Sequence, residues 1–355
     1  MVDSYPILTL IPPLLAIGLV VATRRVLLSL GLGVLAAALL IEGFSPWGAL
    51  EQVVGAFVDI FWVDGAVNTT KVYILIFTLM LGVITAFIMM SGGTRAFADW
   101  AQTKIKTRRG ATMLPAGLGV AIFVDDYFNA LAVGQVSRPV TDAHRVSRAK
   151  LAYLVDSTSA PVAVLVPFSS WGAFILGLIG TEVAASSLDL SDINAFLQAA
   201  WANYYAFAAL LLVALVATLH LDLGPMRSEE RRAILDGECF DDSEEIPGRL
   251  AEDLPVHRPG AKNALIVPFA MLVLGVLGGI AWTGQRAAGS WSVVDILAST
   301  DVTFALIVGG LLGLVAAVYY YVRDTSENPK FGTSTFGRGW VEGVRSMLPA
   351  VSILI

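Results

Sequence analysis

Apolar residues in this chain are grouped in long blocks that alternate with short polar stretches. An apolar block of about twenty residues is long enough to cross roughly 30 Å of hydrocarbon as a helix. The pattern predicts spanning helices at 5–23, 26–43, 71–91, 151–179, 195–219, 263–283 and 302–322. The shorter segment 47–62 predicts an interfacial helix or one part of a broken span. We therefore expect an all-α polytopic membrane protein.

Lysine and arginine in short loops predict which side of the membrane each loop occupies. Arg24 and Arg25 follow the first apolar run, so we expect that run to be retained as a helix, with the N-terminus outside. The loop 181–194 has Glu182, Asp189 and Asp192 but no basic residue, which predicts the outside. The polar segment 220–262 is predicted to be cytoplasmic.

The apolar stretch 111–137 has basic residues on both flanks. The charges are Arg95, Lys104, Lys106, Arg108 and Arg109 before it, and Arg138, His144, Arg145, Arg148 and Lys150 after it. With both flanks in the cytoplasm, the stretch cannot cross once, so we predict a re-entrant hairpin with arms at 111–124 and 128–136. Backbone at the tip of such a hairpin must be buried in protein or line a wet cavity.

Composition excludes several classes of protein. Hydrophobic residues make up 56% of the 355 residues and charged residues only 15%, whereas soluble domains carry about 25% charged residues. The net charge of −6, without a basic stripe, makes nucleic acid an unexpected partner. The single cysteine, Cys239, cannot form an internal disulfide or a zinc site. No phosphate loop, metalloprotease motif or nucleophile elbow is present, so we expect neither an enzyme nor a cofactor.

The first candidate site is the sequence Phe123-Val-Asp-Asp-Tyr-Phe-Asn129. Asp125 and Asp126 follow a run of apolar residues, although a charge at the bilayer centre costs roughly 2.5–3.5 kcal/mol even on a lenient scale. Asn129 is three and four residues away, so its side chain shares a helix face with theirs. Such oxygens suit a hard cation such as sodium. The alternative is a surface position at which the pair caps a helix.

The second candidate site is Asp156, with the hydroxyls of Ser157, Thr158 and Ser159 and the following Pro161. Proline removes a backbone donor and disfavours helix at the residue before it, so we expect the helix to break near Asp156. Asp156 or a neighbouring serine could equally be the N-cap of a helix. Ser169, Ser170 and Trp171 follow Pro167 and are either further ligands or packing residues.

Other polar and small residues have simpler interpretations. Arg138 is predicted to pair with Asp142 at the surface. Glycines within apolar runs are expected to permit close helix contacts rather than to bind a ligand; they are Gly31, Gly33, Gly309 and Gly313.

Four segments together resemble the NhaC-type sodium/proton antiporter family, within the wider ion-transporter superfamily. They are 123–129, 136–142, 147–153 and 156–162. The resemblance implies an inverted repeat with hairpins and broken helices around a central site. It divides the chain into a first membrane repeat at 1–219, a cytoplasmic loop at 220–262 and the start of a second repeat at 263–355. The chain stops inside an apolar run, so we expect a truncated protein whose second hairpin lies beyond Ile355.

The mechanism implied is competition between sodium and protons for the same carboxylate oxygens. The pKa of such an aspartate must rise from about 3.9 to near neutrality, which burial and an adjacent carboxylate both favour. We expect Asp125, Asp126 and Asp156 to carry sodium or protons, with Asn129, Ser157, Thr158 and Ser159 as neutral ligands and Ser169 and Ser170 as further candidates. The expected location is the cell membrane, and a homodimer is an open alternative.

Two other functions stay open on the sequence, and a third is remote. A sodium- or proton-coupled exchanger of an organic anion such as malate or lactate would need cations near the site, for which Arg148 and Lys150 are the candidates. A membrane scaffold or sensor gives no reason for three aspartates in apolar surroundings. An intramembrane aspartyl protease would require a different sequence around Asp156.

Overall fold

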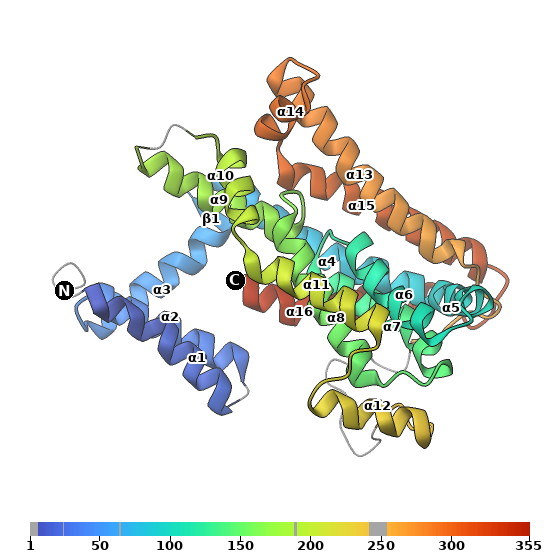
Figure 1. Ribbon diagram of the computed structural model, residues 1–355. Coiled ribbons are helices and arrows are strands. Elements are labelled where there is room, and N and C mark those ends of the chain that lie inside the picture. Colours follow the sequence, from blue (N-terminus) through green and yellow to red (C-terminus); the bar gives the residue numbers. More distant parts are fainter. Residues whose placement is uncertain (1–5, 24, 64, 188–189, 241–253) are drawn as a thin grey trace. The chain divides into compact units, whose positions relative to one another are not determined.

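The computed structural model describes residues 6–23, 25–63, 65–187, 190–240 and 254–355 (Figure 1). Tyr5 at the start of the first expected span, the topogenic Arg24, and Asp189 of the expected outer loop lie outside this range. The chain divides into two compact units, one formed by residues 1–75 with 349–355 and the other by 76–348. The described part is helical apart from one two-stranded ribbon, which confirms an all-α protein.

The first unit contains short apolar helices. A 3₁₀ turn (Pro6–Leu10) leads into α1 (Ile11–Thr23), α2 (Val26–Ile41) and α3 (Pro46–Phe61), followed by strands β1 (Trp62–Val63) and β2 (Ala66–Val67). The strands are antiparallel, with Trp62 opposite Val67. Both α1 with its leading turn and α2 have fewer than 18 residues. The two expected N-terminal spans are therefore shorter than the pattern of apolar residues predicted.

Within the described residues, four helices, or five with a bent pair, are long and apolar enough to cross a membrane. They are α4 (Thr69–Met90), α8 (Arg148–Leu165) continued by α9 (Ser170–Ala185), α13 (Asn263–Ala288), α15 (Val302–Thr325), and the pair α10 (Asp192–Trp201) and α11 (Tyr204–Leu219). The last pair bends by 51°, so the span expected at 195–219 is interrupted between Trp201 and Tyr204. The chain is a multi-pass membrane protein.

The core of the second unit surrounds α4. Phe77, Leu81, Ile84 and Phe87 are fully buried on this helix, which is apolar on all sides and thus suited to the centre of a bundle. The helices α13 and α15 lie side by side (Figure 1). The remaining helices of this unit are α5 (Gly93–Lys104), α6 (Arg108–Ala121), α7 (Asp126–Ala143), α12 (Pro225–Leu235), α14 (Val293–Ser299) and α16 (Thr333–Leu354), which extends past it.

Candidate functional site: the hairpin tip and the break between α8 and α9

The stretch predicted as a hairpin consists of α6 and α7, joined by residues 122–125. Gln102, shortly before α6, donates a hydrogen bond to the carbonyl of Pro139 near the end of α7 (3.0 Å), so the two helices run in opposite directions. The second arm is longer than expected, since α7 continues to Ala143. The depth of this hairpin in the membrane stays a prediction.

Asn129 closes the tip of the hairpin. Its Nδ2 donates to the carbonyl oxygens of Gly119 (2.6 Å) and Ile122 (2.7 Å). Carbonyls at the end of a helix lack partners within the helix, so these bonds satisfy groups of α6 that the chain reversal leaves open. The Oδ1 atom of Asn129 is buried and has no hydrogen-bond partner. Because buried polar atoms are nearly always paired, this oxygen is available to a ligand.

Asp125 begins α7 and is almost completely enclosed, with 3% of its surface exposed. Its Oδ1 accepts the backbone N–H of Phe128 (2.8 Å), so it is an N-cap, as the alternative interpretation held. Its Oδ2 accepts the hydroxyl of Ser170 (2.7 Å). The neighbouring Asp126 is half-buried and accepts the indole Nε1–H of Trp171 (2.8 Å). Asp125 is therefore both a helix cap and a buried carboxylate.

The break between α8 and α9 lies at residues 166–169, not near Asp156 as expected. The helix α8 continues through Pro161 to Leu165. Val166 precedes Pro167 and is extended (φ −100°, ψ 117°), the conformation that a following proline favours. Ser169 then caps α9 by accepting the N–H of Gly172 (2.7 Å), and its hydroxyl donates to the carbonyl of Ala163 (2.5 Å).

The hairpin tip is joined to the first turn of α9. The backbone N–H of Ser170 donates to the carbonyl of Val124 (2.8 Å), beside the bonds of Ser170 and Trp171 to the two aspartates. The interruption between α6 and α7 thus contacts the interruption between α8 and α9, about 45 residues further along the chain. Of the two further candidate ligands, Ser170 contacts Asp125 directly, whereas Ser169 holds the break together.

The cluster from Asp156 to Ser159 lies within α8, which packs against α6 of the hairpin at Gly119 and Thr158. Thr158 and Ser159 are buried and donate to carbonyls of their own helix, Thr158 to Leu154 (2.8 Å) and Ser159 to Asp156 (3.3 Å). Ser157 is half-buried and the Asp156 side chain is exposed. Among the described residues, no three His, Cys, Asp or Glu side chains are grouped to hold one metal ion. The three aspartates therefore do not form a single cluster.

A buried ion-pair network lies at the other end of α6 and α8. Lys150 is fully buried, with its Nζ 2.5 Å from Asp222 and 3.4 Å from Glu230. Glu230 also pairs with Arg108. Sequence reasoning missed this network, because a glutamate in a polar segment gives no signal of burial. The expected pair of Arg138 and Asp142 is present (4.0 Å), and Asp142 also binds Arg148 (3.3 Å).

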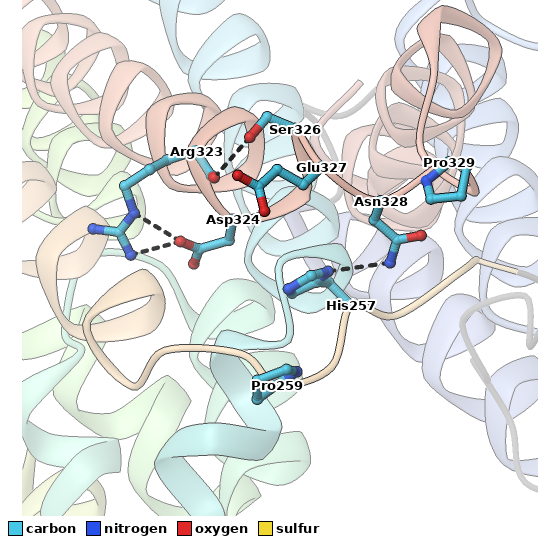
Figure 2. A pocket seen from close by; sticks show the side chains of 8 residues that line it. All are labelled: His257, Pro259, Arg323, Asp324, Ser326, Glu327, Asn328 and Pro329. Carbon is cyan, nitrogen blue, oxygen red and sulfur yellow. Dashed lines mark hydrogen bonds and ion pairs between the residues drawn. The ribbon is translucent and has the colours of Figure 1, made fainter.

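A cavity of about 540 Å³ lies apart from these residues, between the segment before α13 and the turn from α15 to α16 (Figure 2). Arg323 there is paired with Asp324 (2.6 Å), and His257 contacts Asn328 (3.3 Å). None of the predicted site residues lines this cavity. We therefore take the hairpin tip as the candidate site.

Interrupted helices that bring polar side chains together are a feature of secondary transporters. Residues 162–355, more than half of the chain, match the Na+/H+ antiporter family, and the chain belongs to that family. Asp125, Asp126, Asn129 and Asp156 precede the matched region, so the match does not assign their roles.

One similar protein is an uncharacterized protein of Haemophilus influenzae, 37% identical over 356 residues. The alignment covers 99% of this chain and 66% of that protein, so this chain spans less than two thirds of the relative's length. No solved structure matches this chain.

Proposed function

We propose that this chain is part of a sodium/proton antiporter of the NhaC type, in which Asp125 binds either sodium or a proton. The observation that carries the proposal is the enclosure of Asp125, 3% exposed, at the contact between the hairpin tip and α9. A carboxylate buried among interrupted helices in a membrane is costly and suits an ion site. The unpartnered Oδ1 of Asn129 supplies a neutral oxygen one helical turn from it.

Asp126 and Asp156 supply further negative charge to the same region. Asp126 is next to Asp125 in the sequence, and Asp156 lies on α8, which packs against α6 of the hairpin. We propose that this charge attracts the cation and that Asp156 lies on its path, with the hydroxyl of the adjacent Ser157 as a neutral ligand. Thr158 and Ser159 bond to backbone carbonyls, so their oxygens retain lone pairs for a ligand.

An organic-anion exchanger is less well supported by the contacts. The cations that such a substrate needs are already engaged, since Lys150 pairs with Asp222 and Glu230, and Arg148 pairs with Asp142. We further propose that the protein resides in the cell membrane with its N-terminus outside and the segment 220–262 inside. The division into repeats and a homodimeric assembly belong to the same proposal.

The test is exchange in vesicles with an imposed pH gradient and a fluorescent proton reporter. Adding sodium chloride should dissipate the gradient for the unaltered protein, and Asp125→Asn and Asp156→Asn should each abolish the response while keeping the melting temperature. Asp99→Asn, at an exposed carboxylate on α5, is the matched control and should exchange normally. Sodium-dependent proton movement in both variants would contradict the proposal. A response to malate or lactate but to no chloride salt would favour the anion exchanger.

A further inference from the structure

The segment from Asp222 to Phe240, which contains α12, is attached to the hairpin and to α8 through buried polar contacts. At its centre is Glu230, with 1% of its surface exposed. Its Oε1 accepts the backbone N–H of Ser147 (2.7 Å), and its Oε2 pairs with Arg108 and with Lys150 (3.4 Å). A single carboxylate therefore binds three groups from two other elements.

The charges in this network balance. Arg108 and Lys150 are the cations, and Asp222 and Glu230 are the anions. A buried ion pair contributes little net stability over an apolar alternative, but removing one partner leaves an uncompensated buried charge and is strongly unfavourable. Glu229, the preceding residue, has no such role, because it pairs with Arg232 on α12 itself and is partly exposed.

The groups that Glu230 joins begin the two helices that lead to the candidate site. Arg108 is the first residue of α6, and Ser147 caps α8. The same two helices meet again at Gly119 and Thr158, close to the hairpin tip. Arg108 and Gly119 are eleven residues apart, which is about 16 Å along a helix. Fixing α6 and α8 at two points this far apart fixes both the shift and the tilt of one helix relative to the other.

Further contacts attach the rest of the segment to the turn between α7 and α8. Arg145 donates to the carbonyl of Ile234 at the end of α12 (3.1 Å). The backbone N–H of Arg148 donates to the carbonyl of Cys239 (2.8 Å), and its guanidinium lies over the ring of Phe240 at 5.0 Å. The segment thus contacts the bases of α6, α7 and α8.

We propose that this segment is a clamp and that Glu230 is a positioning residue for ion exchange. By holding the bases of α6 and α8 together, the clamp keeps the hairpin tip in register with α9, so that Asp125 keeps its place beside Ser170. The inference rests on the proposed antiport function, because it assigns the clamp to that same site.

The experiment compares Glu230→Gln with Glu229→Gln, an adjacent change of identical chemistry, in the protein reconstituted in vesicles. Two readouts are needed: the rate at which a maleimide labels Cys239, which reports whether the segment is docked, and the sodium dependence of proton exchange. Glu230→Gln should raise both the labelling rate and the half-saturating sodium concentration about tenfold or more, since a buried pair has been broken. Glu229→Gln should change neither, and Glu230→Asp should restore part of the sodium affinity.

Asp222→Asn is a milder second variant if Glu230→Gln does not fold. The Asp222 side chain is 18% exposed, and the substitution removes only one of the two partners of Lys150. It should show the same changes to a smaller extent. Unchanged labelling, or faster labelling with unchanged sodium dependence, would overturn the clamp. Absence of exchange in the unaltered protein would instead overturn the proposed function, and this inference with it.

Discussion

Gly119 sets how closely α6 approaches α8. A Cβ atom at this position would overlap the Oγ1 of Thr158 and lie 2.8 Å from its Cβ. The Thr158 side chain is fully buried and its hydroxyl is bonded to the carbonyl of Leu154 (2.8 Å), so it cannot rotate away without losing that bond. Glycine is therefore required for the close contact beside the hairpin tip.

Gly119→Ala should lower the stability of the protein by about 1–3 kcal/mol, the usual cost of overpacking a core, and should weaken sodium-dependent exchange. Thermal unfolding in detergent and the vesicle assay measure the two effects. Gly117→Ala is the control on the same helix, since nothing lies within 4 Å of a Cβ there. It should be neutral or slightly stabilising because alanine favours helix over glycine. Equal melting temperatures for the two variants would contradict the close contact.

His220 follows the last residue of α11 and has a positive φ of 53°. Partial burial, together with the nearby charges of Arg108 and Lys150, lowers the pKa of this imidazole below its ordinary value. The folded protein consequently binds a proton at His220 less readily than the unfolded chain does. Stability from this residue is fully present above pH 6.5 and is lost as the pH falls below it.

His220→Asn should reduce this acid sensitivity, since asparagine does not titrate and tolerates a positive φ. The measurement is the melting temperature at about pH 7.5 and about pH 5.5 for both proteins, a range that brackets the ordinary histidine pKa. The unaltered protein should lose more stability over this interval than the variant. An equal loss in both would mean that other groups account for the acid sensitivity.

Single residues differ in how visible they are in the sequence. Asp125 and Asp156 stand out because each interrupts an apolar run, and the structure encloses the first of them and leaves the second exposed. Glu230 follows another glutamate in a polar segment, so only the folded contacts distinguish the buried residue from its neighbour. A charged residue can be recognised as a site candidate when it lies in an apolar run. In a polar segment, a buried charged residue does not differ from its neighbours.

Small residues shape the contact between α13 and α15. A Cβ at Gly309 would lie 2.7 Å from the carbonyl of Leu272, and one at Gly275 would lie 2.7 Å from the Cα of Gly309. Such close approach allows backbones to pack in the absence of a hydrophobic driving force within lipid. The expected role of glycines in close helix contacts is confirmed for Gly33, Gly309 and Gly313, but it was wrong for Gly31, which has nothing within 4 Å.

Gly309→Ala should separate these two helices and reduce stability by about 1–3 kcal/mol. Gly278→Ala, on the open side of α13, has nothing within 4 Å and is the matched control. Thermal unfolding in detergent compares the two variants. A loss in Gly278→Ala as large as in Gly309→Ala would indicate an effect of helix sequence rather than of packing.

The positions at which helices are interrupted were harder to predict from the sequence than the helices themselves. Pro161 and Pro167 lie in the same apolar stretch of the sequence, but α8 passes through Pro161 and ends just before Pro167. Proline within a membrane helix is tolerated when neighbouring groups satisfy the freed backbone. At Pro167, Ser169 instead bonds to the carbonyls of Ala163 and Val166, which stabilises the interruption. The choice depends on tertiary contacts that the local sequence does not contain.

The side of the membrane on which each loop lies is testable with the single cysteine. Burial is the main cause of the raised pKa of the Cys239 thiol, so labelling should be slow and is best followed at mildly alkaline pH. A membrane-impermeant maleimide should label Cys239 in inverted vesicles and not in intact cells. Ser187→Cys in a Cys239→Ser background should show the reverse, since Ser187 is exposed in the loop predicted to be outside. Labelling of Cys239 in intact cells would reverse the proposed topology.

The two aspartates at the hairpin tip differ in the kind of partner each has. The hydroxyl of Ser170 can donate to an ionised Asp125 or accept from a protonated one, so this bond survives a change of charge with its direction reversed. The indole of Trp171 can only donate, so its bond to Asp126 is strongest while that carboxylate is ionised. In the exchange proposed above, Asp125 can therefore change its protonation while the tip stays docked, whereas the bond to Trp171 favours a constant negative charge on Asp126.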